Sequence, residues 1–298
     1  MMSANAIWFN MICAVSIALI SLSSSRLYRK EPLITSELMS LVSFAPGFFY
    51  SAVAIFYLPL HVAGWTLSAL LIKNILYCLS FYFRYESLRK FGPFVGALML
   101  GTQPIVIFVF GLFLLGETLS STQMFSVILA AAALVTLAAK GKGSAQNRIN
   151  LNDFVKYYAF PALASTLAIV WDRYFLKGHF SSSEFFTLDR LTLVPAFLLT
   201  LGLIKQKNFM AGIWRKSYPL IIARNWKSLA MIGALFTFSV YAYNLALGVE
   251  KAAVVGLFRN SSYPLAAFAG AFFFQQKISF REWLSLSFVA SAIFLGVF

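Results

Sequence analysis

Two cations stand out among the residues that could do chemistry, because each lies deep inside an apolar segment. Lys73 lies within the segment 64–83, and Arg259 lies about seven residues into the segment 252–274. Neither has an acidic residue within one helical turn of its own segment. A charge in apolar surroundings costs free energy, so it is a candidate functional residue. If both side chains reach one cavity, they would bind an anionic group such as a carboxylate or a phosphate.

A structural role is the alternative for both cations. Lys73 and Arg259 could pair with buried acids from other segments, such as Asp189 or Glu37. Asp189 is followed directly by Arg190 inside an apolar segment. We therefore expect Asp189 and Arg190 either to form a buried ion pair or to act in coupling.

Three further charged residues lie at segment ends. Asp172 and Arg173 close one apolar segment and are predicted to be exposed anchors of that end. Glu117 follows another apolar segment, close to the predicted membrane interface. A structural role is expected for Glu117, in preference to a role in proton coupling.

Polar and aromatic residues near the two cations could complete a binding pocket. Asn260 is adjacent to Arg259, and Tyr263 lies one helical turn further on the same face. The alternative for the aromatic residues is helix packing or a place in an interfacial belt. The other candidates for the pocket wall are Gln103, Tyr77, Tyr241, Asn244, Trp65 and Trp171.

The composition indicates how such residues are positioned. Of the 298 residues, 60% are hydrophobic and 11% are charged, whereas a soluble domain has roughly 45–50% apolar and about 25% charged residues. A soluble fold of this length could not bury so much apolar surface. The sequence therefore predicts an all-α integral membrane protein, with the lipid bilayer as its surroundings.

The net charge of +14 does not indicate nucleic-acid binding, because the charges lie in short clusters between apolar segments. Arg26, Arg29 and Lys30 form one such cluster, which is typical of charges that fix membrane topology. The two cysteines lie in apolar segments and the two histidines stand alone in sequence. No metal site and no cofactor are predicted.

Ten segments meet the length of about 20 mostly apolar residues that a transmembrane helix needs. The basic stretch 205–227 between two of them is predicted to hold a short interfacial helix. The ten predicted spans are 4–23, 36–57, 64–83, 94–115, 122–139, 154–175, 185–204, 228–247, 252–274 and 283–298.

The distribution of Lys and Arg predicts the orientation of the chain. The loops after the odd-numbered spans hold most of them, whereas the other loops hold Arg173, Lys177 and Lys251. Positively charged loops remain in the cytoplasm. Both termini are therefore expected outside the cell, with the protein in a bacterial cytoplasmic (inner) membrane.

An internal repeat divides the chain. In each half a helix proline, Pro104 or Pro264, precedes an aromatic-rich apolar run and a polar turn that ends in Ser. The repeats are predicted at 1–140 and 153–298, joined by a linker at 141–152. Since five spans is an odd number, the second repeat must be inverted relative to the first. The two prolines are expected to kink their helices and act as hinges.

The run from Pro104 through Leu115-Gly116-Glu117-Thr118 to Gln123 resembles the EamA-type repeat of the drug/metabolite transporter superfamily. The resemblance covers essentially the whole chain. It departs from the family pattern at Gln275-Gln276-Lys277, where an acidic residue is usual, and in the predicted orientation, since family members usually keep both termini in the cytoplasm. It implies ten helices in two repeats and secondary active transport.

The residues themselves exclude other classes. The sequence contains no paired carboxylates or nucleophile–base spacing of the kind that would predict an enzyme. It also contains no filter-like segment that would predict a channel, and no phosphate-binding loop that would predict an ATP-driven pump. We expect a transporter of a small anionic metabolite, driven by H⁺ or a counter-solute. The alternatives are an exporter of neutral or amphipathic metabolites or amino acids and, less favoured, a lipid-modifying enzyme or channel. The oligomeric state stays open.

Overall fold

The chain is helical throughout the part that the structure, a computed structural model, describes. These residues are 4–58, 64–91, 103–138, 151–204, 217–260 and 280–297, together with positions 262, 265 and 272. No strand occurs among them. The helices are α1 (Ala4–Lys30), α2 (Ser36–Ala54), α3 (Gly64–Phe91), α5 (Gln103–Leu115), α6 (Ser121–Ala138), α7 (Leu151–Phe154), the π-helical turn η1 (Val155–Ala159), α8 (Phe160–Leu176), α9 (Ser182–Leu203), α11 (Ser217–Val249), α12 (Ala252–Asn260) and α14 (Phe280–Val297).

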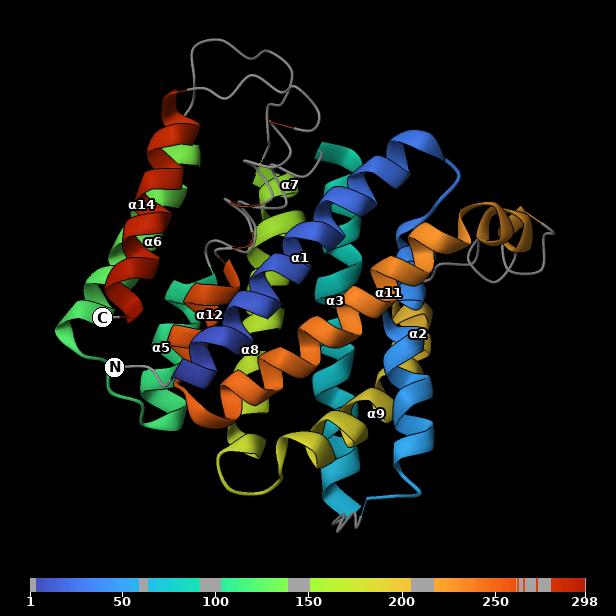
Figure 1. Cartoon of the computed structure of the whole chain (residues 1–298), viewed down its shortest axis with the longest axis horizontal. Coiled ribbons are helices and arrows are strands. Elements are labelled where there is room, and N and C mark those ends of the chain that lie inside the picture. Colours follow the sequence, from blue (N-terminus) through green and yellow to red (C-terminus); the bar gives the residue numbers. More distant parts are fainter. Residues whose placement is uncertain are drawn as a thin grey trace.

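The helices form a bundle in which segments distant in sequence lie side by side (Figure 1). α1 packs along α11, and α3 packs between α8 and α9. α2 contacts α9 and α11, while α5 contacts α8 and α12. α6 and α14 pack mainly against each other, at one edge of the bundle in Figure 1.

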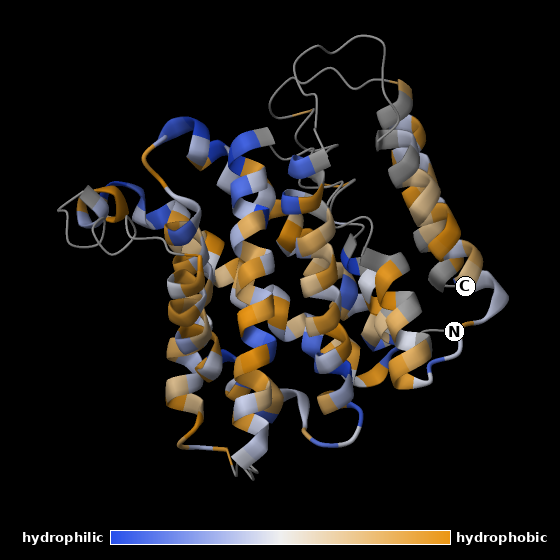
Figure 2. Cartoon of the chain, turned by 180° about the vertical axis from the view of Figure 1, so that it is seen from behind, coloured by the Kyte–Doolittle hydropathy of each residue, from blue (hydrophilic) through white to orange (hydrophobic). Residues whose placement is uncertain are grey.

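Five of the described helices are long and apolar enough to cross a membrane: α1, α2, α3, α9 and α11. Shorter apolar stretches occur in α6 and α14. Large apolar side chains point outward from the bundle, among them Trp8, Phe49, Leu199 and Phe238. Apolar residues are prominent along the helices in Figure 2. This apolar surface and the five long apolar helices are compatible with a membrane-embedded protein, because in water exposed apolar patches favour aggregation.

Several helices extend beyond the apolar segments from which they are predicted. α1 continues through Lys30 and α3 continues through Phe91, in each case across a basic cluster. α11 begins at Ser217, so residues 217–227 of the basic stretch belong to this long helix. The rest of the stretch, 205–216, lies outside the described residues, and the interfacial helix expected there stays a prediction. Hydropathy marks only the part of a helix that suits hydrocarbon, whereas Lys and Arg at helix ends can extend their charges to water.

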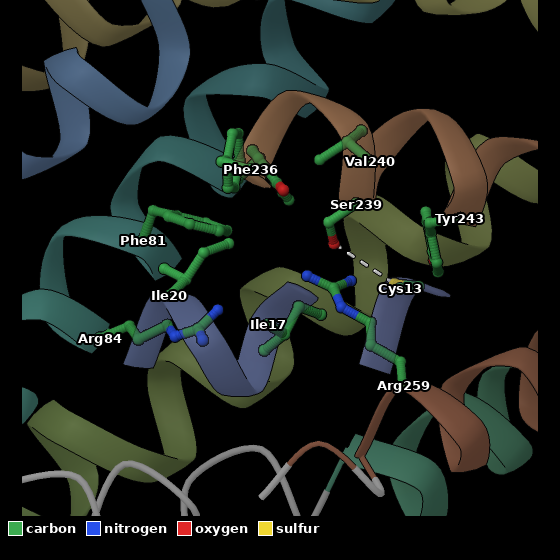
Figure 3. Close-up of a pocket in the computed structure, with 11 residues that line it drawn as sticks. Cys13, Ile17, Ile20, Phe81, Arg84, Phe236, Ser239, Val240, Tyr243 and Arg259 are labelled. Carbon is green, nitrogen blue, oxygen red and sulfur yellow. Dashed lines mark hydrogen bonds between the residues drawn. The ribbon is translucent and has the colours of Figure 1, made fainter. Parts of the chain in front are cut away.

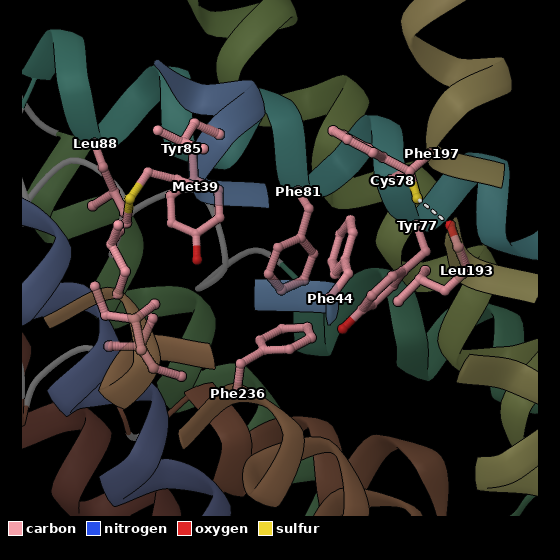
Figure 4. Packing of buried hydrophobic residues seen from close by; sticks show 14 of the residues in the cluster. Met39, Phe44, Tyr77, Cys78, Phe81, Tyr85, Leu88, Leu193, Phe197 and Phe236 are labelled. Atoms are coloured by element: carbon pink, nitrogen blue, oxygen red, sulfur yellow. Dashed lines mark hydrogen bonds between the residues drawn. The ribbon is translucent and has the colours of Figure 1, made fainter. Parts of the chain in front are cut away.

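A cluster of aromatic rings forms the centre of the core (Figure 4). The ring centroid of Phe44 lies 5.7 Å from that of Phe81 and 5.6 Å from those of Phe197 and Phe236. Tyr77 packs on Phe81 at 4.8 Å. Tilted and edge-to-face contacts of this kind stabilise the core beyond the area they bury. The cluster connects α2, α3, α9 and α11 and fixes Tyr77 and Phe81.

Proline and glycine bring α2 and α11 close together. Pro46 lies inside α2 and has no N–H to donate to the carbonyl of Val42, four residues earlier. A Cβ placed on Gly233 of α11 would lie 2.6 Å from that same oxygen. Glycine therefore allows the backbone of α11 to cover a carbonyl that lacks its helical hydrogen bond.

Candidate functional site

Lys73 binds two carboxylates in the interior. Its Nζ lies 2.7 Å from Asp172 Oδ1 and 2.5 Å from Asp189 Oδ1. The side chains of Lys73, Asp172 and Asp189 are 1%, 7% and 1% exposed. Lys73 comes from α3, Asp172 from α8 and Asp189 from α9. One ammonium group therefore links three helices.

Arg190 completes this charge network. Its Nε donates to Asp189 Oδ2 over 3.0 Å, and a second nitrogen donates to the same oxygen. The amide of Asn74 donates to the backbone carbonyl of Asp189 and to Thr192 Oγ1, each over 2.8 Å. The network, defined here as Lys73, Asp172, Asp189 and Arg190, is neutral when all four groups are ionised.

The network corrects one expectation and bears on two others. Asp172 and Arg173 are buried and not exposed at a helix end. Asp189 and Arg190 form a buried ion pair, which is one of the two alternatives expected for these neighbouring residues. The pairing of Lys73 with Asp189 is the structural alternative considered for that cation. Asp172 escaped notice as a buried partner, although it lies inside a predicted apolar span.

A small pocket, drawn in Figure 3, shares Tyr77 with the surroundings of the network. The guanidinium groups of Arg84 and Arg259 extend into it from two sides (Figure 3). Its described lining residues contribute no carboxylate. The free volume is about 10 Å³, roughly the room that one water molecule needs. The other lining residues include Tyr77, Phe81, Phe236, Ser239, Tyr243 and Cys13.

Aromatic rings hold both guanidinium groups. The Arg259 Cζ atom lies 4.9 Å from the centroid of Tyr243, and the Arg84 Cζ atom lies 5.4 Å from that of Phe81. Arg84 also donates to Ser21 Oγ over 3.3 Å. A guanidinium group over the face of a ring keeps its N–H donors in its own plane, where a planar anion can accept them.

Buried polar groups near the pocket lack partners among the described residues. The Tyr243 hydroxyl and the Asn244 amide nitrogen have no hydrogen bond there, and neither does the side chain of Asn10. Asn10 lies one helical turn before Cys13, which lines the pocket. A buried polar group without a partner costs free energy, so these groups favour a polar occupant nearby.

Tyr77 separates the pocket from the charge network. Its ring lines the pocket, while the Nζ of Lys73 lies 5.6 Å and the Cζ of Arg190 lies 5.7 Å from its centroid. Lys73 itself is directed to Asp172 and Asp189. The cation that shares the pocket with Arg259 is therefore Arg84, which the sequence analysis did not single out. The sequence does contain a signal for Arg84: this residue directly follows the predicted apolar span 64–83, where a cluster of basic residues begins.

The remaining predicted pocket residues lie in several places. Trp65 is 56% exposed and stacks on Phe175, and half-buried Trp171 packs against the core. Tyr241 lies with its hydroxyl 3.4 Å from Ser183 Oγ. Asn244 is buried next to Tyr243 in sequence. The side chains of Gln103, Pro104 and Asn260, and all of Tyr263 and Pro264, lie outside the described residues.

Glu117 joins the turn after α5 to the second half of the chain. It accepts hydrogen bonds from Arg173 Nε over 3.3 Å and from the backbone N–H of Ala252 over 3.2 Å. Arg173 also donates to the carbonyl of Leu247, and Lys251 donates to that of Thr118. Ala252 is the first residue of α12, so Glu117 caps that helix. These contacts agree with the structural role expected for Glu117.

Comparison with known proteins shows the fold alone. No protein-family model matches the sequence, and neither does any curated protein sequence. Twenty-eight chains of solved structures are similar. One, described as "Crystal structure of protein", has a TM-score of 0.71 and 14% identity, over 99% of this chain and 96% of that one. The whole chain therefore has an architecture that recurs among solved structures.

Proposed function

We propose that the chain is a secondary active transporter that carries a small anionic solute across a membrane by alternating access. The observation that carries this proposal is a buried pocket into which two guanidinium groups extend between aromatic rings, inside a bundle with an apolar outer surface. A carboxylate or phosphate group suits the two planar forks of donors. The aromatic walls suit an apolar body on the same solute.

The proposed architecture is ten membrane helices in two inverted repeats, as the EamA resemblance implies. The packing of the helices supports it. If α1, α2, α3, α5 and α6 correspond in order to α8, α9, α11, α12 and α14, each major packing pair has a counterpart. The pair α1–α11 becomes α8–α3, α2–α11 becomes α9–α3, and α1–α12 becomes α8–α5. When the two repeats are exchanged, each of the pairs α2–α9, α5–α12 and α6–α14 maps onto the same pair.

The start of α2 and of α9 supports the same correspondence. Thr35 and Ser181 cap these helices, and a glutamate follows in the first turn of each, Glu37 and Glu184. A proline then interrupts each helix, at Pro46 and Pro195. These matched prolines in described helices add to the repeat evidence from Pro104 and Pro264.

The pocket lies between the two proposed repeats. Arg84 and Tyr77 come from the first, and Tyr243 and Arg259 come from the second. Inverted-repeat transporters bind their solutes at such an interface. The free volume of about 10 Å³ is far below that of a metabolite. In this state the pocket is therefore closed, and binding requires the repeats to move apart.

Transport assays with purified protein in proteoliposomes test the proposal. We expect uptake or exchange of at least one radiolabelled probe among phosphate, glycerol phosphate, succinate and an aromatic carboxylate. Arg259→Gln and Arg84→Gln should each abolish it. Arg224→Gln is the matched control, because its side chain is 73% exposed, and it should transport like the wild type. Undiminished anion uptake in both pocket variants would overturn the assignment of the binding site. Uptake of neutral or cationic probes alone would overturn the anionic solute and favour an exporter of neutral or amphipathic metabolites or amino acids.

A further inference from the structure

The charge network treats its two carboxylates unequally. Asp189 is bound on both oxygens, by Lys73 on Oδ1 and by Arg190 on Oδ2. Asp172 has Lys73 as its only cation within ion-pair distance among the described residues. Its side chain is also the more accessible of the two acids, at 7% against 1%. Asp172 is thus the carboxylate that can exchange its partner with the least disturbance.

The other charged and titratable groups around Asp172 are accounted for. α3 contributes Lys73 and Tyr77, α9 contributes the pair Asp189–Arg190, and α11 contributes Tyr243. α12 contributes Arg259, which stacks on Tyr243. The described part of α5 contains no ionisable residue, and η1 lies at the opposite end of α8. On α8 itself, Arg173 is bound to Glu117 and to Leu247.

We propose that Asp172 is a proton-binding site that couples the proposed transport of an anion to the movement of H⁺. A proton taken from water on one side forms an O–H bond on Asp172 and replaces Lys73 as the partner of that carboxylate. Lys73 keeps its charge and its contact with Asp189. The link from α3 to α8 opens while the link from α3 to α9 remains. The proton returns to water on the other side when Lys73 binds Asp172 again.

The charges explain why a proton and an anion would travel together. Protonation of Asp172 changes the network from neutral to one net positive charge. The pocket lies directly across Tyr77 from the network, so this charge stabilises an anion there. Linkage is reciprocal, so an anion in the pocket stabilises the protonated form equally. Because α3 belongs to the first proposed repeat and α8 to the second, the same proton also alters a contact between the repeats.

Infrared difference spectroscopy tests the proton site on the purified full chain without any solute. Spectra at mildly acidic and alkaline pH should show a protonated carboxyl band that shifts in heavy water. The band should be absent in Asp172→Asn and retained, with a small shift, in Asp172→Glu. Asp153→Asn is the matched control, because Asp153 pairs with Lys90 at the surface. A band that is unchanged in Asp172→Asn would overturn the proposal.

Proteoliposomes that carry succinate or phosphate test the coupling. An inward proton gradient should drive wild-type accumulation, whereas Asp172→Asn should fall to the level reached without a gradient and still exchange internal for external probe. The double variant Lys73→Met/Asp172→Asn, which removes one charge of each sign, should behave in the same way. Gradient-driven accumulation in either variant, or loss of exchange in both, would overturn the coupling role.

The two proposals fail in different ways. If the wild type carries none of the probes, the proposed function fails, while the infrared band still decides whether Asp172 binds a proton. If the wild type transports but the band and the gradient response do not depend on Asp172, only the proton site fails.

Discussion

At the scale of the residue, the two cations that the sequence singles out in apolar segments have different surroundings. Arg259 faces a pocket, whereas Lys73 lies between two carboxylates. Their local sequences are alike, since neither has an acid within one helical turn. The partners of Lys73 come from other helices, and one of them, Asp189, lies 116 residues further along the chain. Sequence spacing can therefore find a buried charge, but not the charge that neutralises it.

Removal of the Lys73 charge should destabilise the fold. Lys73→Met would leave two buried carboxylates with a single cation, Arg190. Loss of one partner from a buried ion pair costs about 3–5 kcal/mol, so the melting temperature in detergent should fall clearly. Lys90→Met is the control: its ammonium pairs with Asp153 at 46% exposure, and such pairs contribute about 0–1 kcal/mol.

The double variant Lys73→Met/Asp172→Asn separates charge from packing. It should recover part of the lost stability, because Asp189 and Arg190 then remain as a balanced pair. If Lys73→Met melts like the wild type, the network does not stabilise the fold as described.

At the scale of the element, helix contacts depend on small features that hydropathy does not record. The apolar segments predict the positions of α2 and α9 to within a few residues. They do not predict that α11 crosses α2 at Gly233, above the carbonyl that Pro46 leaves without a donor. That contact is a property of two helices together, so it is absent from either segment alone.

Gly233→Ala should lower stability, because its Cβ would lie 2.6 Å from the Val42 oxygen and 2.9 Å from the Pro46 ring. Overpacking of this kind costs about 1–3 kcal/mol. Gly202→Ala, also inside a helix, meets no atom within 4 Å and should be neutral or slightly stabilising, since Ala is the better helix former. Thermal unfolding of both variants in one detergent makes the comparison. Equal melting temperatures would show that α2 and α11 do not touch there.

At the scale of the whole molecule, the sequence predicts the helical class correctly, whereas the division of the chain into two repeats stays a prediction. The described helices follow the predicted segments in order, and the differences lie at the ends, where basic residues extend α1, α3 and α11. The pocket was only partly predictable. Arg259 could be found from its own segment, whereas Arg84 and Tyr243 enter the pocket through the packing of α3 and α11.

The charge distribution predicts that both termini lie outside the cell. Alkaline phosphatase fused after the C-terminus should therefore be active in a bacterial host, and a fluorescent protein that matures in the cytoplasm should stay dark there. A fusion within the linker 141–152 should give the opposite pattern. A bright C-terminal fluorescent fusion would reverse the orientation and agree with the usual arrangement of the EamA-type transporters.

The turn at Glu117 has a consequence for the order in which the chain is made. Glu117 is separated from Arg173 by 56 residues and from Ala252 by 135. During synthesis its carboxylate is therefore made long before these donors exist. Until those segments are made, the amino-terminal half lacks these donors for Glu117, and the contacts of the turn are complete only when α12 begins at Ala252. Assembly of the amino-terminal half is thus completed only by the arrival of the carboxy-terminal half.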